Sequence, residues 1–215
     1  MRSVRVFYKK KKLLRFVSHL DVNRLMPRII RKTNIPVWYT EGFNSHIYIN
    51  FALPLSLGFE SDYEALDFKV TDDGFSNEAV FSELSRVMPE HIEIIKVADP
   101  VFKPGKIAFA KFSISFEDGG AIASSLEEFL KAESITVLKK TKKGTMKEVE
   151  LADKIARFSI KLNVNTQLEV ILSAGADNIN PQLLLSAFES FLGRPLPDLH
   201  ITRTMLYTED LEEFC

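Results

Sequence analysis

The order of hydrophobic patterns in the first hundred residues restricts the possible fold more than any other feature of the chain. Patterns typical of strands and helices follow one another at residues 4–8 (strand), 18–34 (helix), 48–53 and 65–70 (strands), 76–88 (helix) and 92–97 (strand). This order is that of the ferredoxin-like split βαβ arrangement. Shorter β-type runs at 13–17 and 37–40 predict two additional strands.

The pattern starts again after residues 99–105, a stretch with two prolines and a glycine that we interpret as a linker. Strand patterns lie at 112–116, 158–164, 168–172 and 200–207, and helices are predicted after a capping box at Ser125 and Glu128 and after Asn180. A hairpin carries Lys142 and Lys143 at its tip. We therefore predict an α+β fold, a tandem of two ferredoxin-like sandwiches over residues 1–100 and 106–215.

Positive charge is concentrated at the start of the chain. Residues 1–35 hold eleven lysines and arginines and a single acid, Asp21, whereas the whole chain has a formal net charge of −1. In the predicted first helix, Arg24, Arg28 and Arg31 are spaced to share one face, which is therefore basic. This asymmetry favours an anionic partner for the front of the molecule, although the same charges would also serve to solvate a surface or to meet the acidic half of the chain.

The single cysteine, Cys215, excludes an internal disulfide and any site in this chain built from several cysteines, such as an iron–sulfur cluster. The longest apolar stretch, residues 48–59, is interrupted by polar residues and by Pro54 and is too short to cross a bilayer, and the basic start lacks the apolar core of a signal peptide. We expect a cytoplasmic protein with no membrane contact.

Two short segments concentrate residues with chemical potential. Ser18 and Asp21 are spaced for a helix cap beside His19, and a turn follows at Glu41 to Asn44, where Gly42 and Asn44 accommodate positive φ, just before His46. Pro27 lies inside the predicted helix and predicts a kink or a late helix start. His19 and His46, with Asp21 and Glu41, have the composition of an acid–base pair, but a helix cap explains Ser18, His19 and Asp21 equally well.

The runs R-F-V-S-H-L-D-V-N-R at 15–24, G-F-N-S-H at 42–46 and F-A-L-P-L at 51–55, together with Gly58 and the spacing of Ser61, Glu64 and Asp67, resemble the DUF2344 family, also called radical SAM-linked proteins. Weaker matches are K-K-G at 142–144 and Arg203-Thr204. The chain differs at Ser45 and Ile47, where the family usually has prolines, and at E-L-A-D (150–153), where the family has D-I-R-P.

The resemblance implies a protein that is encoded beside, or fused behind, a radical SAM enzyme. Such an enzyme needs three thiolates for its cluster, so any radical chemistry would belong to a partner acting in trans. We expect no cofactor and no metal site in this chain.

Our leading hypothesis is a non-catalytic accessory module that binds RNA, such as tRNA, through the basic segment at residues 1–35, which we call the basic front. The residues expected to bind RNA or ligand are Arg15, Ser18, His19, Arg24, Arg28, Arg31, Gly42, Phe43, Asn44, His46, Lys142 and Lys143. One alternative is a metal-independent ribonuclease or RNA-modifying enzyme with His19, Asp21 and His46 as catalytic candidates. Another is a protein–protein adaptor that binds no RNA.

Overall fold

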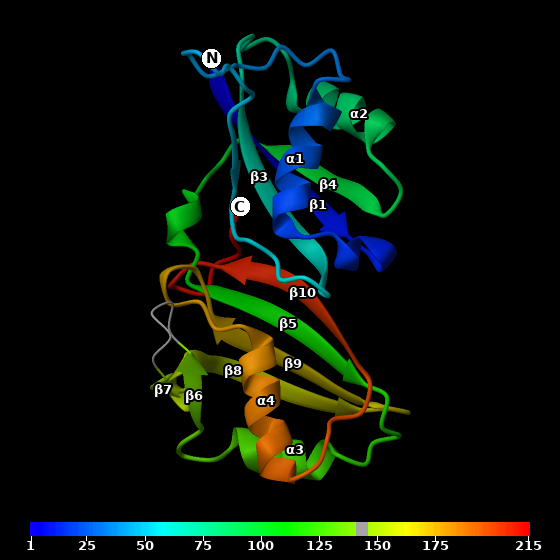
Figure 1. The fold of residues 1–215 in the computed structure, drawn as a ribbon. Helices are drawn as coiled ribbons and strands as arrows, with labels where there is room; N and C mark the ends of the chain where they lie inside the picture. The colour runs from blue at the N-terminus through cyan, green and yellow to red at the C-terminus, as the bar shows by residue number, and fades with distance from the viewer. Residues whose placement is uncertain (141–145) are drawn as a thin grey trace. The chain divides into compact units, whose positions relative to one another are not determined.

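The computed structural model describes residues 1–140 and 146–215 and contains both helices and strands (Figure 1). The described strands are β1 (Arg2–Lys10), β2 (Ile49–Phe51), β3 (Glu60–Val70), β4 (Ile92–Ala98), β5 (Phe109–Phe116), β6 (Thr136–Lys140), β7 (Met146–Glu150), β8 (Ile155–Leu162), β9 (Thr166–Ser173) and β10 (Leu199–Tyr207). The described α-helices are α1 (His19–Ile30), α2 (Asn77–Val87), α3 (Ala123–Leu130) and α4 (Pro181–Leu192). No helix in the described part of the chain is long and apolar enough to cross a membrane.

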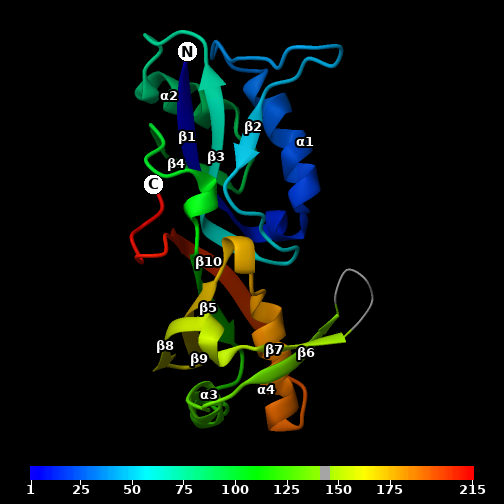
Figure 2. The same cartoon turned by 90° about the vertical axis from the view of Figure 1, so that its left-hand side faces the viewer.

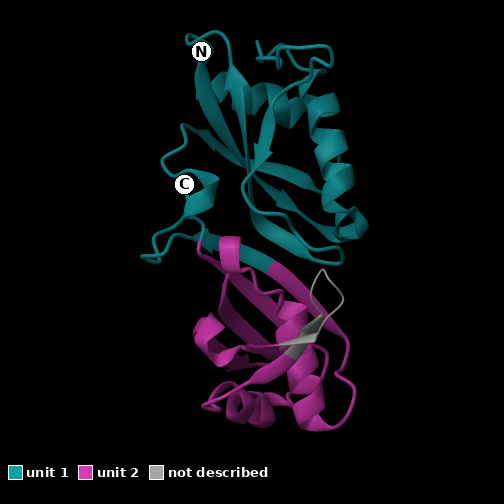
Figure 3. Cartoon of the chain, turned by 60° about the vertical axis from the view of Figure 1, so that its left-hand side comes forward, with its two compact units in different colours: residues 1–107, 203–215 teal, residues 108–202 magenta. Residues whose placement is uncertain are grey.

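The chain forms two compact units (Figure 3). Unit 1 comprises residues 1–107 and 203–215, and unit 2 comprises residues 108–202. The expected domains 1–100 and 106–215 differ from these units at the end of the chain, because the second part of β10 and the residues after it belong to unit 1. A sequence pattern predicts the strand β10, but it does not show that the boundary between the two units falls within that strand.

Unit 1 is an antiparallel sheet covered on one face by α1 and α2 (Figures 1 and 2). Its strands follow the order β4-β1-β3, and β2 and the second part of β10 are neighbours of β3. The core between helices and sheet is apolar: Val22 and Met26 of α1 and Leu84 of α2 pack against Val6 and Phe68 of the sheet. Alternate residues of β1 and β3, such as Val6 and Phe68, thus face the helices.

Two predicted strands of unit 1 are absent from the structure. The strand expected at 13–17 is one of them: residues 12–16 form a 3-10 helix, because Lys12 adopts a positive φ of 52° and turns the chain out of the sheet. Residues 37–40 form only isolated bridges, from Val37 to Val70 and from Tyr39 to Ile47, since β2 occupies the neighbouring edge of β3. The first helix is shorter than predicted and ends at Ile30.

Unit 2 has the strand order β10-β5-β9-β8, in which β9 pairs antiparallel with both β5 and β8, and a separate hairpin formed by β6 and β7. Helices α3 and α4 meet through Phe129 and Phe188, whose ring centroids lie 5.3 Å apart. The predicted capping box of the third helix is wrong: Ser125 lies inside α3, and the carboxylate of Asp118 accepts from the backbone N–H of Ile122 at the true start.

Two buried ion pairs hold the sheet of unit 1. The guanidinium of Arg203 on β10 is 2% exposed and donates to Glu64 of β3, with Nε at 3.1 Å, and also to the carbonyls of Leu53 (2.8 Å) and Pro54 (3.1 Å). On the other side, the buried Arg5 of β1 donates through Nε and Nη2 to both oxygens of Asp67, at 2.7 and 2.8 Å.

These contacts explain the spacing of Ser61, Glu64 and Asp67 in the sequence. The Ser61 hydroxyl donates to the carbonyl of Arg203 at 3.2 Å, so two of the three residues bind Arg203 and the third binds Arg5. Residues an odd number apart on a strand point to opposite faces, which separates Glu64 from Asp67. The motif therefore joins β3 to β1 and β10 through Arg5 and Arg203.

We expect Arg203→Met to lower the free energy of unfolding by about 3–5 kcal/mol, because it leaves the carboxylate of Glu64 buried without its partner. The double variant Glu64→Leu/Arg203→Met should be more stable than Arg203→Met, since no buried charge remains. Chemical denaturation measures both, with the exposed Arg157→Met as control. Equal stability of Arg203→Met and the control would contradict a stabilising role of the pair.

Candidate functional site

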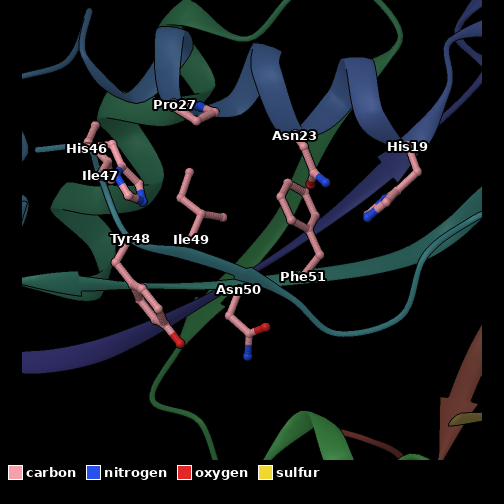
Figure 4. Close-up of a pocket in the computed structure, with 9 residues that line it drawn as sticks. All are labelled: His19, Asn23, Pro27, His46, Ile47, Tyr48, Ile49, Asn50 and Phe51. Atoms are coloured by element: carbon pink, nitrogen blue, oxygen red, sulfur yellow. The ribbon is translucent and has the colours of Figure 1, made fainter. Parts of the chain in front are cut away.

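A groove of about 460 Å³ lies in unit 1 between α1 and the segment that forms β2 (Figure 4). The side chains from α1 are His19, Asn23 and Pro27, and those from the β2 segment are His46, Ile47, Tyr48, Ile49, Asn50 and Phe51. Among the described residues that line it there is no carboxylate. The lining therefore combines imidazoles, amides and aromatic rings, which are groups that bind planar, hydrogen-bonding ligands.

Helix α1 presents its wall of the groove because of the spacing of its residues. His19, Asn23 and Pro27 are four residues apart and so lie on one face, while Val22 and Met26 are buried in the core. Pro27 has no N–H, which removes the helical hydrogen bond to the carbonyl of Asn23. Within the described chain, Oδ1 of Asn23 also has no hydrogen-bond partner. The wall formed by α1 therefore presents hydrogen-bond acceptors that have no donor within the described chain.

His19 lies at one end of the groove, where its ring meets Phe51 edge to face with centroids 5.2 Å apart. Burial lowers its pKa below the ordinary value of 6.5; the charges of Arg203 and Lys10 act in the same direction, and that of Glu64 opposes them. The imidazole is therefore neutral at pH 7 and able both to donate and to accept a hydrogen bond.

His46 is oriented by its own loop. Its Nδ1 lies 2.9 Å from the carbonyl of Asn44 and 3.1 Å from the hydroxyl of Thr40, and its backbone N–H donates to the same hydroxyl. Because a carbonyl only accepts, the neutral ring carries its proton on Nδ1. Its Nε2 is then the acceptor. The structure places both predicted histidines in one groove.

The acid of the predicted catalytic set has a different role. Ser18 caps α1 by accepting from the backbone N–H of Asp21, and its hydroxyl donates to the Asp21 carboxylate at 2.6 Å. The same carboxylate lies 3.6 Å from Arg24. Ser18 and Asp21 thus form the helix cap, and the charges acting on His19 come from Glu64, Arg203 and Lys10.

The basic residues at the front of the chain fall into two groups. Much of the lysine run is engaged within unit 1: Lys9 pairs with Glu93 and Lys11 with Asp62, while the buried Lys10 donates to the carbonyl of Val17. The arginines of α1 are exposed instead. Arg24 faces only Asp21, and Arg28 and Arg31 have no acidic partner in the described chain. Arg28 and Arg31 are therefore exposed cations at the end of α1, the helix that forms one wall of the groove.

The remaining predicted binding residues occupy several places. Arg15 lies over the ring of Phe16 with 4.8 Å between its guanidinium and the ring centroid. Gly42 has a φ of 114°, which favours glycine, and the side chain of Phe43 is completely exposed. Lys142 and Lys143 lie outside the described residues.

Seven lining residues were missed by sequence reasoning: Asn23, Pro27, Ile47, Tyr48, Ile49, Asn50 and Phe51. The spacing of Asn23 and Pro27 from His19 carried the signal, since residues at intervals of four share a helix face. Tyr48 to Phe51 gave no such signal, because a strand pattern does not show which strand face meets a groove. Near this segment, Lys69 lies 4.8 Å above the ring of Trp38 and 5.8 Å above that of Tyr48.

Comparisons place this site in context. Residues 3–181 match the model of a family described as "Uncharacterized protein conserved in bacteria (DUF2344)". No curated protein matches the sequence. Among solved structures, a chain of "Crystal Structure of a Cbf5-Nop10-Gar1 Complex" is similar in fold, with a TM-score of 0.53 and 10% identity over 95% of this chain. The chain spans half the length of that protein, so the likeness concerns the α/β fold alone.

The lowered pKa of His19 predicts a specific pH dependence of stability. A histidine whose folded pKa lies below its unfolded value is stable as the neutral ring, so the free energy of unfolding should fall as the pH drops below 6.5 towards the folded pKa. His19→Gln should remove this part of the acid sensitivity. NMR titration of the ring checks the cause directly, and a titration midpoint at or above 6.5 would contradict it.

Proposed function

The chain belongs to the DUF2344 family, and we propose that it binds single-stranded RNA along α1 and the adjoining groove without catalysing a reaction itself. The observation that carries the proposal is the position of Arg28 and Arg31, exposed and without acidic partners among the described residues, beside a groove without carboxylates. Arginine binds phosphate through a planar fork of donors, and its charge releases counterions from nucleic acid.

The lining of the groove favours an unpaired nucleotide as the ligand. Tyr48 and Phe51 offer aromatic rings, and Asn23 and Asn50 offer amides that match the hydrogen-bonding edges of bases. The bases of an RNA duplex are inaccessible in its deep, narrow major groove, whereas a single strand exposes them. A volume of about 460 Å³ lies within the usual range of sites for small ligands.

We propose a radical SAM enzyme as the catalytic partner in trans. The support is the resemblance to proteins encoded beside such enzymes, together with the single cysteine, since a radical SAM cluster needs three thiolates. In this arrangement the present chain would hold the RNA and the partner would carry out the chemistry.

We also propose that both units are variants of the split βαβ arrangement. In unit 1, β4-β1-β3 with β2 beside β3 is the order expected for strand, helix, strand, strand, helix, strand. In unit 2, β10-β5-β9-β8 is the same order with a hairpin inserted between α3 and β8. This equivalence supports an origin of the tandem in one repeated plan.

Reversal of charge on α1 tests RNA binding. In Arg28→Glu/Arg31→Glu we expect weaker binding of a labelled single-stranded RNA of mixed sequence. The slope of log K against log salt should fall by about 1.4, at roughly 0.7 for each phosphate contact on a single strand. Fluorescence anisotropy at several salt concentrations measures both quantities.

Arg157→Glu is the matched control, since Arg157 is exposed in unit 2 and its reversal changes the net charge in the same way at one site. It should leave the salt slope close to that of the wild type. An effect of Arg157→Glu about half as large as that of the double variant, in proportion to the change in net charge, would show that net charge alone is responsible. A wild-type chain that retains no RNA would instead favour the protein adaptor.

A second candidate function, RNA cleavage without a metal, is favoured by one observation: His19 and His46 line the same groove, and both rings are suited to accept a proton. If the chain cleaves RNA in the presence of a chelator, His19→Ala and His46→Ala should each slow cleavage by about 10²–10⁴-fold, the usual contribution of general acid–base catalysis. Unchanged cleavage in both variants would assign the activity to a contaminant and reject this candidate.

A further inference from the structure

The turn before β2 is a closed, hydrogen-bonded loop. The backbone N–H of Thr40 donates to the carbonyl of His46 at 2.8 Å, and the N–H of His46 donates to the Thr40 hydroxyl at 3.1 Å. The bridge between Tyr39 and Ile47 continues this pairing at the base. The His46 ring closes the loop from within through the carbonyl of Asn44. These contacts fix the path of residues 40–46.

At the tip of this loop, Phe43 projects fully into solvent, with a relative exposure of 110%. Gly42 makes the tip possible, because its φ of 114° is a conformation that other residues rarely adopt. Single exposed apolar residues are common on protein surfaces. Phe43 differs from most because a closed loop holds it there, and because His46, at the other end of the loop, lines the groove.

The surroundings of the loop indicate what Phe43 contacts. Tyr48 lines the groove, and Lys69 lies above the rings of both Trp38 and Tyr48. Rings beside a cation, as Trp38 and Tyr48 are beside Lys69 at the base of the loop, are typical of surfaces that bind single-stranded nucleic acid, where bases stack on side chains and cations neutralise phosphates. A pocket of a protein partner would bury Phe43 equally well but would not need the cations.

We propose that Phe43 stacks on an unpaired RNA base next to the nucleotide held in the groove. This inference rests on the proposed RNA binding and adds the part of the RNA that is recognised: the face of a base, independent of its sequence. Every base has such a face, so Phe43 would strengthen binding without selecting a sequence.

Three substitutions at the loop tip separate stacking from simple apolar contact. Because Phe43 is exposed, we expect Phe43→Ala, Phe43→Leu and Phe43→Trp to fold like the wild type, which the melting temperature checks. Phe43→Ala and Phe43→Leu should weaken binding of labelled single-stranded RNA by about 5- to 150-fold, the range measured for loss of one stacked base. Phe43→Trp should retain wild-type affinity.

An RNA with abasic sites supplies the complementary change. It should bind the wild type at least as weakly as intact RNA binds Phe43→Ala, because the groove loses its base as well. Phe43→Ala should not weaken the binding of this abasic RNA any further, because one interaction cannot be lost twice. The salt slope should be the same in all Phe43 variants, in contrast to Arg28→Glu/Arg31→Glu.

The outcomes distinguish this inference from the function on which it rests. If Phe43→Leu binds as tightly as the wild type, or if Phe43→Ala is unaffected while the α1 variant is weakened, stacking is overturned and RNA binding stands. If the wild type binds no single-stranded RNA, both are overturned. In that case, loss of a protein partner's binding in Phe43→Ala would assign Phe43 to a protein contact.

Discussion

The buried ion pair between Arg203 and Glu64 is the interaction on which unit 1 depends. A guanidinium that is 2% exposed requires partners for its donors, and Arg203 makes four hydrogen bonds, two to the carboxylate of Glu64 and one each to the carbonyls of Leu53 and Pro54. These partners lie on β3 and on the segment just after β2. A residue near the end of the chain thus fixes the segment that carries Phe51, and Phe51 in turn contacts His19. The position of the groove wall formed by the β2 segment therefore depends on the hydrogen bonds of the buried Arg203 guanidinium.

The groove itself arises from two local departures from regular structure. On one side, Pro27 interrupts the hydrogen-bond ladder of α1 at the carbonyl of Asn23, although Ser18 caps the helix normally. On the other side, β2 is only three residues long, so the chain before it pairs through isolated bridges and forms the loop at residues 40–46. Continuous pairing in this segment would have favoured a longer strand in place of the loop, and an uninterrupted helix would have left no unpaired carbonyl beside the groove.

Sequence reasoning found what local chemistry determines. The caps Ser18 and Asn180 are confirmed, because each depends on neighbours within one turn. It failed where distant residues decide. The run at 13–17 has strand composition but follows a backbone turn at Lys12, and the capping box at Ser125 gave way to Asp118 seven residues earlier. The pair of Arg203 with Glu64 spans 139 residues and leaves no periodic pattern, so only the spacing of Ser61, Glu64 and Asp67 hinted at it.

The basic front of the chain shows most clearly why composition alone does not define a site. Arg5, Lys9, Lys10 and Lys11 satisfy their charges within unit 1, through Asp67, Glu93, the carbonyl of Val17 and Asp62. Folding therefore neutralises a large part of the charge that the sequence displays, and the exposed remainder includes Arg28 and Arg31 at the end of α1. Arg28 follows the groove residue Pro27 by one position and so lies about 100° around the helix from it, whereas Arg31, the C-cap, lies four residues after Pro27 and continues the row that faces the groove. The helical period thus places exposed cations both beside and in line with the residues of α1 that line the groove.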